Sequence, residues 1–156
     1  MKGWDRLASR VAIVTGASSG IGAAIAERFG RERMRVALAA RRGDLLERVA
    51  DQVRAAGGEA LVIPTDVRDP AALTRLATVT KDTWGRIDVL VANAGVGASG
   101  RLVQISEDAI REVVEVNLLW VILGARSVLP VMLEQREGLI IAIASVAGRV
   151  SGRGGV

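Results

Sequence analysis

A glycine-rich segment between an apolar run and a helical pattern is the feature that most constrains how this chain can fold. Residues 15–22 read Thr-Gly-Ala-Ser-Ser-Gly-Ile-Gly and directly follow the apolar residues 11–14. The three glycines allow a sharp turn, a close approach of the backbone to a ligand and tight packing of a helix on a strand. Free N–H groups at the start of that helix then attract an anion. We therefore predict a strand, a turn and a helix that bind the pyrophosphate of a dinucleotide.

Composition excludes several classes of chemistry. The 156 residues, 50% of them hydrophobic, are enough for one domain with its own core. The chain has no cysteine and no histidine, so disulfides, thiolate catalysis, imidazole acid–base chemistry and histidine ligation of a metal are excluded. Carboxylate ligation is not excluded, but no metal site is predicted.

Neither a membrane nor a nucleic acid is predicted as a partner. The N-terminus lacks the apolar core of a signal peptide, and no window reaches the roughly 18 uninterrupted apolar residues of a membrane span. The net charge of +4 comes from arginines scattered along the chain, often beside acidic residues, and only 3% of the residues are aromatic. Such a distribution is typical of a solvated surface of mixed charge. We therefore expect a soluble, cytoplasmic protein.

Apolar runs alternate with helical patterns along the whole chain. The runs are nearly continuous in apolar residues, as in strands that are covered on both faces of a parallel sheet. They predict strands near residues 11–15, 36–39, 60–64, 87–92 and 139–144. Right-handed crossovers with helices on both faces then give an α/β fold, a doubly wound Rossmann-type parallel sheet in a single domain.

The helical patterns also predict where helices begin, end and bury side chains. The first is expected to bury Ile21, Ile25 and Phe29 at four-residue spacing. Asp69, which is followed by a proline, is predicted to open the third helix, and Gly85 is predicted to end it.

The longest helical pattern covers residues 106–134 and begins at Ser106, with acidic residues in its first turn. Pro130 is expected to bend or end this helix. The apolar positions predicted to form its stripe are Ile110, Val113, Val114, Leu118, Val121, Ile122, Val128 and Met132.

Further motifs follow the glycine turn in a fixed order. They are Asp66-Val67 after the third predicted strand, Asn93-Ala94-Gly95 after the fourth, Asn117 on the long helix and Ser145 after the fifth strand. Together with the turn, they resemble the short-chain dehydrogenases/reductases over the whole chain. The resemblance implies an oxidoreductase that transfers a hydride between a nicotinamide cofactor and a small carbonyl or alcohol substrate.

The resemblance also implies roles for individual residues. The cofactor-binding residues of the turn would be Thr15, Gly16, Ser18, Ser19, Gly20, Ile21 and Gly22. Asp66 would meet the adenine, and Val67 would supply a backbone contact. The segment 93–95, comprising Asn93, Ala94 and Gly95, would lie beside the cofactor and steady the central strand. Ser145 would polarise the substrate oxygen, and Asn117 would hold a water molecule. Taken singly, each of these residues also suits a turn, a cap or a helix face.

Two arginines bear on the choice of cofactor. In dinucleotide-binding folds an acid about 20 residues beyond the glycine turn binds the adenosine ribose and selects NAD. Arg41 and Arg42 stand there instead, and guanidinium groups pair well with the 2′-phosphate of NADP. We predict a preference for NADP(H). The alternative, which allows NAD(H), is that both arginines are exposed charges before a helix and that Asp44 is the acid. The basic residue within the glycine turn that commonly marks NADP binding in the family is also missing, since Ser18 and Ser19 stand there.

The expected acid/base pair is absent. The resemblance implies a Tyr-x-x-x-Lys motif at or just after Val156, following the glycine-rich residues 151–155, but the chain contains no tyrosine. Hydride transfer to a ketone leaves negative charge on oxygen, which must be protonated. We therefore expect residues 1–156 to be the N-terminal part of an oxidoreductase, incomplete at the C-terminus and inactive alone. The alternative is a non-catalytic NAD(P)-binding module; a nucleic-acid binder is disfavoured by the scattered charge.

The resemblance implies a homodimer or homotetramer for the full-length protein. Residues 139–143 would form an exposed apolar sheet edge if no strand followed them. The face of the long helix that carries Val113, Leu118 and Trp120 would also lack cover. We expect the 156 residues alone to self-associate.

Overall fold

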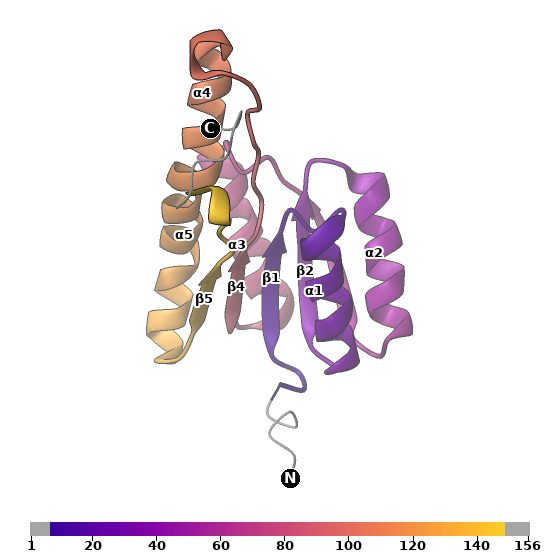
Figure 1. Ribbon diagram of the computed structural model, residues 1–156. Helices are drawn as coiled ribbons and strands as arrows, with labels where there is room; N and C mark the ends of the chain where they lie inside the picture. The colour runs from indigo at the N-terminus through magenta and orange to yellow at the C-terminus, as the bar shows by residue number, and fades with distance from the viewer. Residues whose placement is uncertain (1–6, 149–156) are drawn as a thin grey trace.

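A parallel sheet forms the centre of the protein (Figure 1). The computed structural model describes residues 7–148. The strand order is β3-β2-β1-β4-β5, and all neighbouring strands are parallel. The strands are β1 (Val11–Thr15), β2 (Arg35–Ala40), β3 (Glu59–Pro64), β4 (Val89–Ala92) and β5 (Leu139–Ala142). The predicted doubly wound α/β sheet is confirmed.

Helices cover both faces of this sheet (Figure 1). They are α1 (Gly20–Arg31), α2 (Gly43–Ala55), α3 (Pro70–Trp84), α4 (Glu107–Val114) and α5 (Trp120–Gln135). Helices α1 and α2 pack on one face, whereas α3 and α5 pack on the other. A π-helical turn, Glu115–Leu119, connects α4 directly to α5.

Strand β1 shows why the strands are apolar throughout. All of its residues are buried. Ala12 and Val14 pack in the cluster beneath α1 and α2, whereas Ile13 packs in the cluster beneath α3 and α5. Because successive side chains point to opposite faces, a strand covered on both sides needs apolar residues at every position. Full burial of one such aliphatic side chain contributes about 1.5–3 kcal/mol.

The predicted ends of α3 are confirmed. The carboxylate of Asp69 accepts a hydrogen bond from the N–H of Ala71 at 2.9 Å, and Pro70 occupies the first helical position. Gly85 ends the helix in a left-handed conformation with φ of 75°. Both signals act locally, through a side-chain cap and a backbone that lacks a Cβ.

Two predictions about helices are wrong in part. Ile21 is 62% exposed, whereas Ile25 and Phe29 pack against the core as expected. Pro130 does not end α5, which continues to Gln135. Proline removes the hydrogen bond to the carbonyl of residue 126, and this costs little here because both residues 126 and 130 are exposed to water.

The π-helical turn changes which residues of the long helix are buried. It accommodates one more residue than an α-helical turn and so rotates the helix that follows. Trp120, expected on the uncovered face, is 1% exposed, and its indole N–H donates to the carbonyl of Ala94 at 3.2 Å. Three stripe residues are exposed contrary to prediction, namely Ile110 and Val114 before the π-helical turn and Ile122 after it. Leu118 is exposed, as expected for the uncovered face, and Val128 and Met132 are buried as predicted.

The continuous helical segment Glu107–Gln135 is 29 residues long, with a mean hydropathy of 1.8 over its most apolar window. By length and composition alone it could cross a membrane, which differs from the expectation above. Part of this apolar character is accounted for by packing, because Val128, Val131 and Met132 of α5 belong to the core beneath α3.

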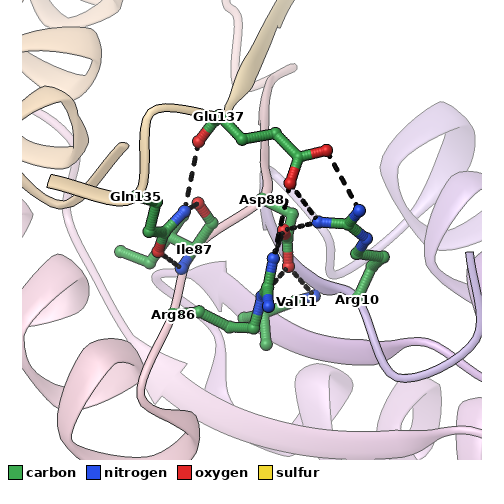
Figure 2. Close-up of polar contacts among 7 residues, drawn as sticks. All are labelled: Arg10, Val11, Arg86, Ile87, Asp88, Gln135 and Glu137. Carbon is green, nitrogen blue, oxygen red and sulfur yellow. Dashed lines mark hydrogen bonds and ion pairs between the residues drawn. The ribbon is translucent and has the colours of Figure 1, made fainter. Parts of the chain in front are cut away.

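At the amino ends of the strands, a buried carboxylate binds several neighbouring groups (Figure 2). Asp88, which directly precedes β4, is 6% exposed. It accepts hydrogen bonds from the N–H of Val11 at 2.8 Å, from Nη1 of Arg10 at 2.7 Å and from Nε of Arg86 at 2.8 Å. Asp88 therefore ties the beginnings of β1 and β4 together.

The loop between α5 and β5 joins the same group of side chains (Figure 2). The side-chain amide of Gln135 pairs with both backbone groups of Ile87, at 2.9 Å each. Glu137 accepts hydrogen bonds from the guanidinium of Arg10 at 2.6 and 3.0 Å. Because Ile87 bonds to Gln135 rather than to a neighbouring strand, β4 begins later than the predicted range 87–92.

We predict that Asp88→Asn lowers the free energy of unfolding by about 2 kcal/mol, because hydrogen bonds from charged donors lose their ionised acceptor. Burial alone would raise the pKa of Asp88, but hydrogen bonds from Arg86, Val11 and Arg10 outweigh it and hold the pKa below 3.8. The stabilisation is therefore present above pH 3.8 and lost as the pH falls through the lowered pKa.

Urea denaturation of the wild type and of Asp88→Asn between pH 2 and 7 measures this contribution. The difference in free energy of unfolding between the wild type and Asp88→Asn should become smaller as the pH falls below about 3.8. Asp82→Asn, an exposed change on α3, is the matched control and should stay within about 0.5 kcal/mol of the wild type. A difference independent of pH would rule out the ionised carboxylate as the stabilising group.

We also predict that the 156-residue chain self-associates, because large apolar side chains are exposed along the long helix and on β5. Leu118 is 58% exposed, Leu133 72% and Leu139 54%. Exposed patches and strand edges of this kind promote association. Light scattering should give an average mass above that of the monomer; a single monomeric species that unfolds cooperatively would contradict the prediction.

Candidate functional site

A cleft of about 460 Å³ lies at the carboxyl ends of the strands. The strand order reverses there, because β1 lies between β2 and β4, and ligands bind at such switch points in open α/β sheets. Most of the predicted cofactor residues line the cleft: Gly16, Ser18, Ser19, Ile21, Arg41, Arg42, Asp66, Val67, Asn93, Ala94 and Gly95. Thr15, Gly20 and Gly22 are not among the lining residues.

The glycine turn follows β1 and packs closely against the segment after β4. Gly16 has φ of +63° and Gly20 has φ of +57°, a region that side chains with a Cβ rarely adopt. At Gly22 the constraint is space, since a Cβ there would lie 2.5 Å from the carbonyl oxygen of Gly16 and 2.6 Å from Nδ2 of Asn93. The turn is therefore closed by backbone contacts that only glycine permits.

Hydrogen bonds between Thr15 and Asn93 hold the ends of β1 and β4 together. The buried hydroxyl of Thr15 donates to the carbonyl of Val91 at 3.1 Å and accepts from the N–H groups of Asn93 at 3.0 Å and Ala94 at 3.2 Å. The amide of Asn93 donates in turn to the carbonyl of Thr15 at 2.9 Å. As the resemblance implies, this segment steadies the central strand.

The start of α1 presents backbone donors at the cleft. Ser19 is the N-cap residue, in an extended conformation, and its side chain caps no N–H group of the helix. The first turn of α1 contains no acidic residue. The N–H groups of that turn have no partner within the helix, and together with the helix dipole they favour an anion at this position.

Arg42 extends from the end of β2 to the glycine turn. Its Nη2 donates to the hydroxyls of Ser18 at 3.2 Å and Ser19 at 3.4 Å. A basic group therefore lies beside the turn, although the turn itself contains none. Arg41 lines the same side of the cleft, whereas Asp44 is in the first turn of α2 and is not among the lining residues.

Asp66 follows β3 and is paired with an arginine that the sequence did not single out. Its Oδ2 accepts from Nη2 of Arg68 at 2.7 Å, and its Oδ1 accepts from Nε at 3.1 Å and from the backbone N–H of Arg68 at 3.0 Å. The side-chain hydrogen bond from Arg68 holds the pKa of Asp66 below 3.8. The carboxylate is therefore ionised at neutral pH and acts only as an acceptor.

The two predicted catalytic residues are not in the lining of the cleft. Asn117, in the π-helical turn, donates to the carbonyl of Val96 at 2.8 Å and accepts from its N–H at 2.9 Å. Its amide thereby fixes the backbone of Val96 in the segment that continues from Gly95. Ser145 is exposed after β5, where its Oγ accepts from the N–H of Ala147 at 3.2 Å. Residues 151–155, expected to precede the tyrosine, lie outside the described residues.

The cleft is also lined by Val96 and by residues that the sequence interpretation missed, namely Ala40, Thr65, Arg68, Glu112 and Val116. Position in the chain was a usable signal for Thr65 and Arg68, since both flank Asp66-Val67 just after a predicted strand. Glu112 had no such signal, because its place at the cleft depends on how α4 packs.

Comparisons with known proteins agree with this geometry. A family model described as short chain dehydrogenase matches residues 10–156. An uncharacterized oxidoreductase of Listeria innocua is 35% identical over 147 residues, which are 94% of this chain and 59% of that protein. The chain thus spans about three fifths of the length of this curated relative.

Solved structures show the same similarity. A short chain dehydrogenase/reductase from Burkholderia phymatum in complex with NAD is 39% identical, with a TM-score of 0.89 over 94% of this chain and 52% of that one. A metagenomic short-chain oxidoreductase in complex with NADP is 41% identical, with a TM-score of 0.88 over 94% of this chain and 66% of that one.

We predict that Gly22→Ala lowers the free energy of unfolding by about 3 kcal/mol, because its Cβ would overlap a backbone carbonyl that cannot move without opening the turn. Gly20→Ala is the matched control. It has nothing within 4 Å of the added Cβ and should cost only about 1 kcal/mol of backbone strain. Urea denaturation measures both; equal losses would show that crowding against Gly16 and Asn93 is not the constraint.

Proposed function

The chain belongs to the short-chain dehydrogenase family, and from that premise we propose that its cleft binds a nicotinamide dinucleotide. The observation that carries the proposal is the glycine turn, where Gly16 and Gly22 pack against Asn93 without room for a Cβ at the mouth of a cleft. The structures in complex with NAD and with NADP support the same class of cofactor.

We place the parts of the cofactor as the family resemblance implies and as the lining of the cleft allows. The pyrophosphate faces the start of α1, where unpaired N–H groups favour an anion. The adenosine lies toward Asp66 and Val67, which follow β3. The nicotinamide lies toward Ala94 and Gly95, which follow β4 on the other side of the switch point.

The preferred cofactor in this proposal is NADP(H). Arg41 and Arg42 stand at the end of β2, and Ser18 and Ser19 hold the guanidinium of Arg42 beside the turn. A 2′-phosphate would meet two cations there, and charge-assisted hydrogen bonds of this kind are stronger than neutral ones. Asp44, the acid that would favour NAD(H), stands away from the cleft lining.

The reaction proposed for the whole protein is hydride transfer between NADP(H) and a carbonyl or alcohol substrate. The bound nicotinamide would supply or accept the hydride. Ser145 would donate a hydrogen bond to the substrate oxygen from the end of β5, and Asn117 would maintain the adjoining segment through Val96. In this proposal the protonating residue is a tyrosine, which the 156 residues do not contain.

We further propose that the whole protein acts as a homodimer or homotetramer on a small molecule. The exposed apolar residues of α4 and α5 support a contact between copies, since exposed apolar surface favours association.

The absence of a tyrosine favours one competing function, a module that binds NAD(P) without catalysis. Reading the coding sequence beyond codon 156 separates the two. An oxidoreductase requires a Tyr-x-x-x-Lys motif shortly after Val156. A reading frame that continues without this motif would leave only the binding module.

We predict that Arg41→Gln with Arg42→Gln weakens binding of NADPH at least tenfold, since about 1.5–3 kcal/mol is lost with a hydrogen bond to a charged group, and leaves NADH binding nearly unchanged. Arg48→Gln, an exposed change on α2, controls for the lost charge. Fluorescence titration gives the dissociation constants.

Two results of this titration would count against the proposal. A double variant that still prefers NADPH over NADH would exclude Arg41 and Arg42 as the phosphate site. A wild type that shows no signal with millimolar NADPH or NADH would remove the binding function itself.

A further inference from the structure

We propose that Arg68 is a positioning residue for purine recognition, which fixes the carboxylate of Asp66 as an acceptor for the exocyclic amine of adenine. The inference rests on the proposed function, because it assumes a dinucleotide in the cleft. Arg68 itself lines the cleft next to Asp66 and Val67.

The first step is the geometry of the pair. Arg68 engages both oxygens of Asp66 through Nη2 at 2.7 Å and Nε at 3.1 Å, and its own backbone N–H adds a third contact at 3.0 Å. A planar guanidinium that binds a carboxylate in this two-point manner fixes its orientation as well as its charge. Oδ1 already accepts two of these hydrogen bonds, whereas Oδ2 accepts a short hydrogen bond only from Nη2 and keeps a lone pair for a further donor.

The second step is what holds Arg68. Its Nη1 lies 3.5 Å from Oε1 of Glu112 on α4, so the guanidinium is placed between two carboxylates from different elements. Both acids line the cleft. Their side chains are 36% and 42% exposed, and that of Arg68 is 40% exposed. Because exposed ion pairs contribute little to stability, a role in recognition explains this arrangement better than a role in folding.

The third step is the chemistry of the ligand edge. The carboxylate of Asp66 has no proton to donate near neutral pH, and the side-chain hydrogen bond from Arg68 holds its pKa further below the usual value. The group that faces it must therefore be a donor. The amine of adenine donates, whereas a carbonyl oxygen at the same position, as in hypoxanthine, would place two acceptors against each other.

The test compares NADPH with its hypoxanthine analogue, which carries a carbonyl oxygen in place of that amine. Fluorescence titration of the 156-residue chain should give an affinity about tenfold higher for NADPH, as expected for one hydrogen bond to a charged group. Arg68→Gln should reduce this ratio to less than about threefold. Arg68→Lys keeps the charge without the two-point contact and should give an intermediate ratio.

Arg48→Gln, on α2 and outside the cleft, is the matched control and should keep the wild-type ratio. Circular dichroism shows whether each variant is folded. Glu112→Gln leaves Arg68 and Asp66 intact and should reduce the affinity ratio by a smaller amount than Arg68→Gln. A wild-type ratio near one, or an unchanged ratio in Arg68→Gln and Arg68→Lys, would overturn the role of Arg68 alone. Failure of the wild type to bind either dinucleotide would instead overturn the proposed function.

Discussion

The close contact between the glycine turn and the segment after β4 is the constraint on which the site depends. Gly22 approaches the carbonyl of Gly16 and the amide of Asn93 so closely that no Cβ fits. Thr15 and Asn93 then join β1 to β4 through backbone and side-chain hydrogen bonds. These contacts span the switch point of the sheet, so the same interaction holds the central strands and forms the wall of the cleft.

Charged residues have different roles at the two ends of the strands. At the amino ends, the buried carboxylate of Asp88 accepts hydrogen bonds from Arg10, Arg86 and the N–H of Val11. Its charge is therefore paired within the protein. At the carboxyl ends, charged groups such as Arg42 are exposed and line the cleft. Pairing and hydrogen bonding offset the cost of burying a charge, whereas exposed charge at a concave site is available to a ligand.

Features with local causes were predictable from the sequence. Strands covered on both faces must be apolar throughout, and the helix start at Asp69 and stop at Gly85 depend on neighbouring residues only. The burial of Trp120 was not predictable, because it requires a π-helical turn and a hydrogen bond to Ala94. The glycine turn was found from its spacing, whereas the pairing of Arg68 with Asp66 depends on side-chain conformations that no pattern encodes.

The most direct test of the central claim, that the cleft binds a dinucleotide at the glycine turn, is a titration of the ¹⁵N-labelled chain with NADP⁺ followed by NMR. Amide resonances of Gly16, Gly22, Val67 and Gly95 should shift together and saturate, since these residues line one cleft or contact its lining. The amide resonances of residues around Asp88, at the amino ends of the strands, should not shift. Shifts confined to residues around Asp88, or no shifts at all at a high concentration of NADP⁺, would contradict the account.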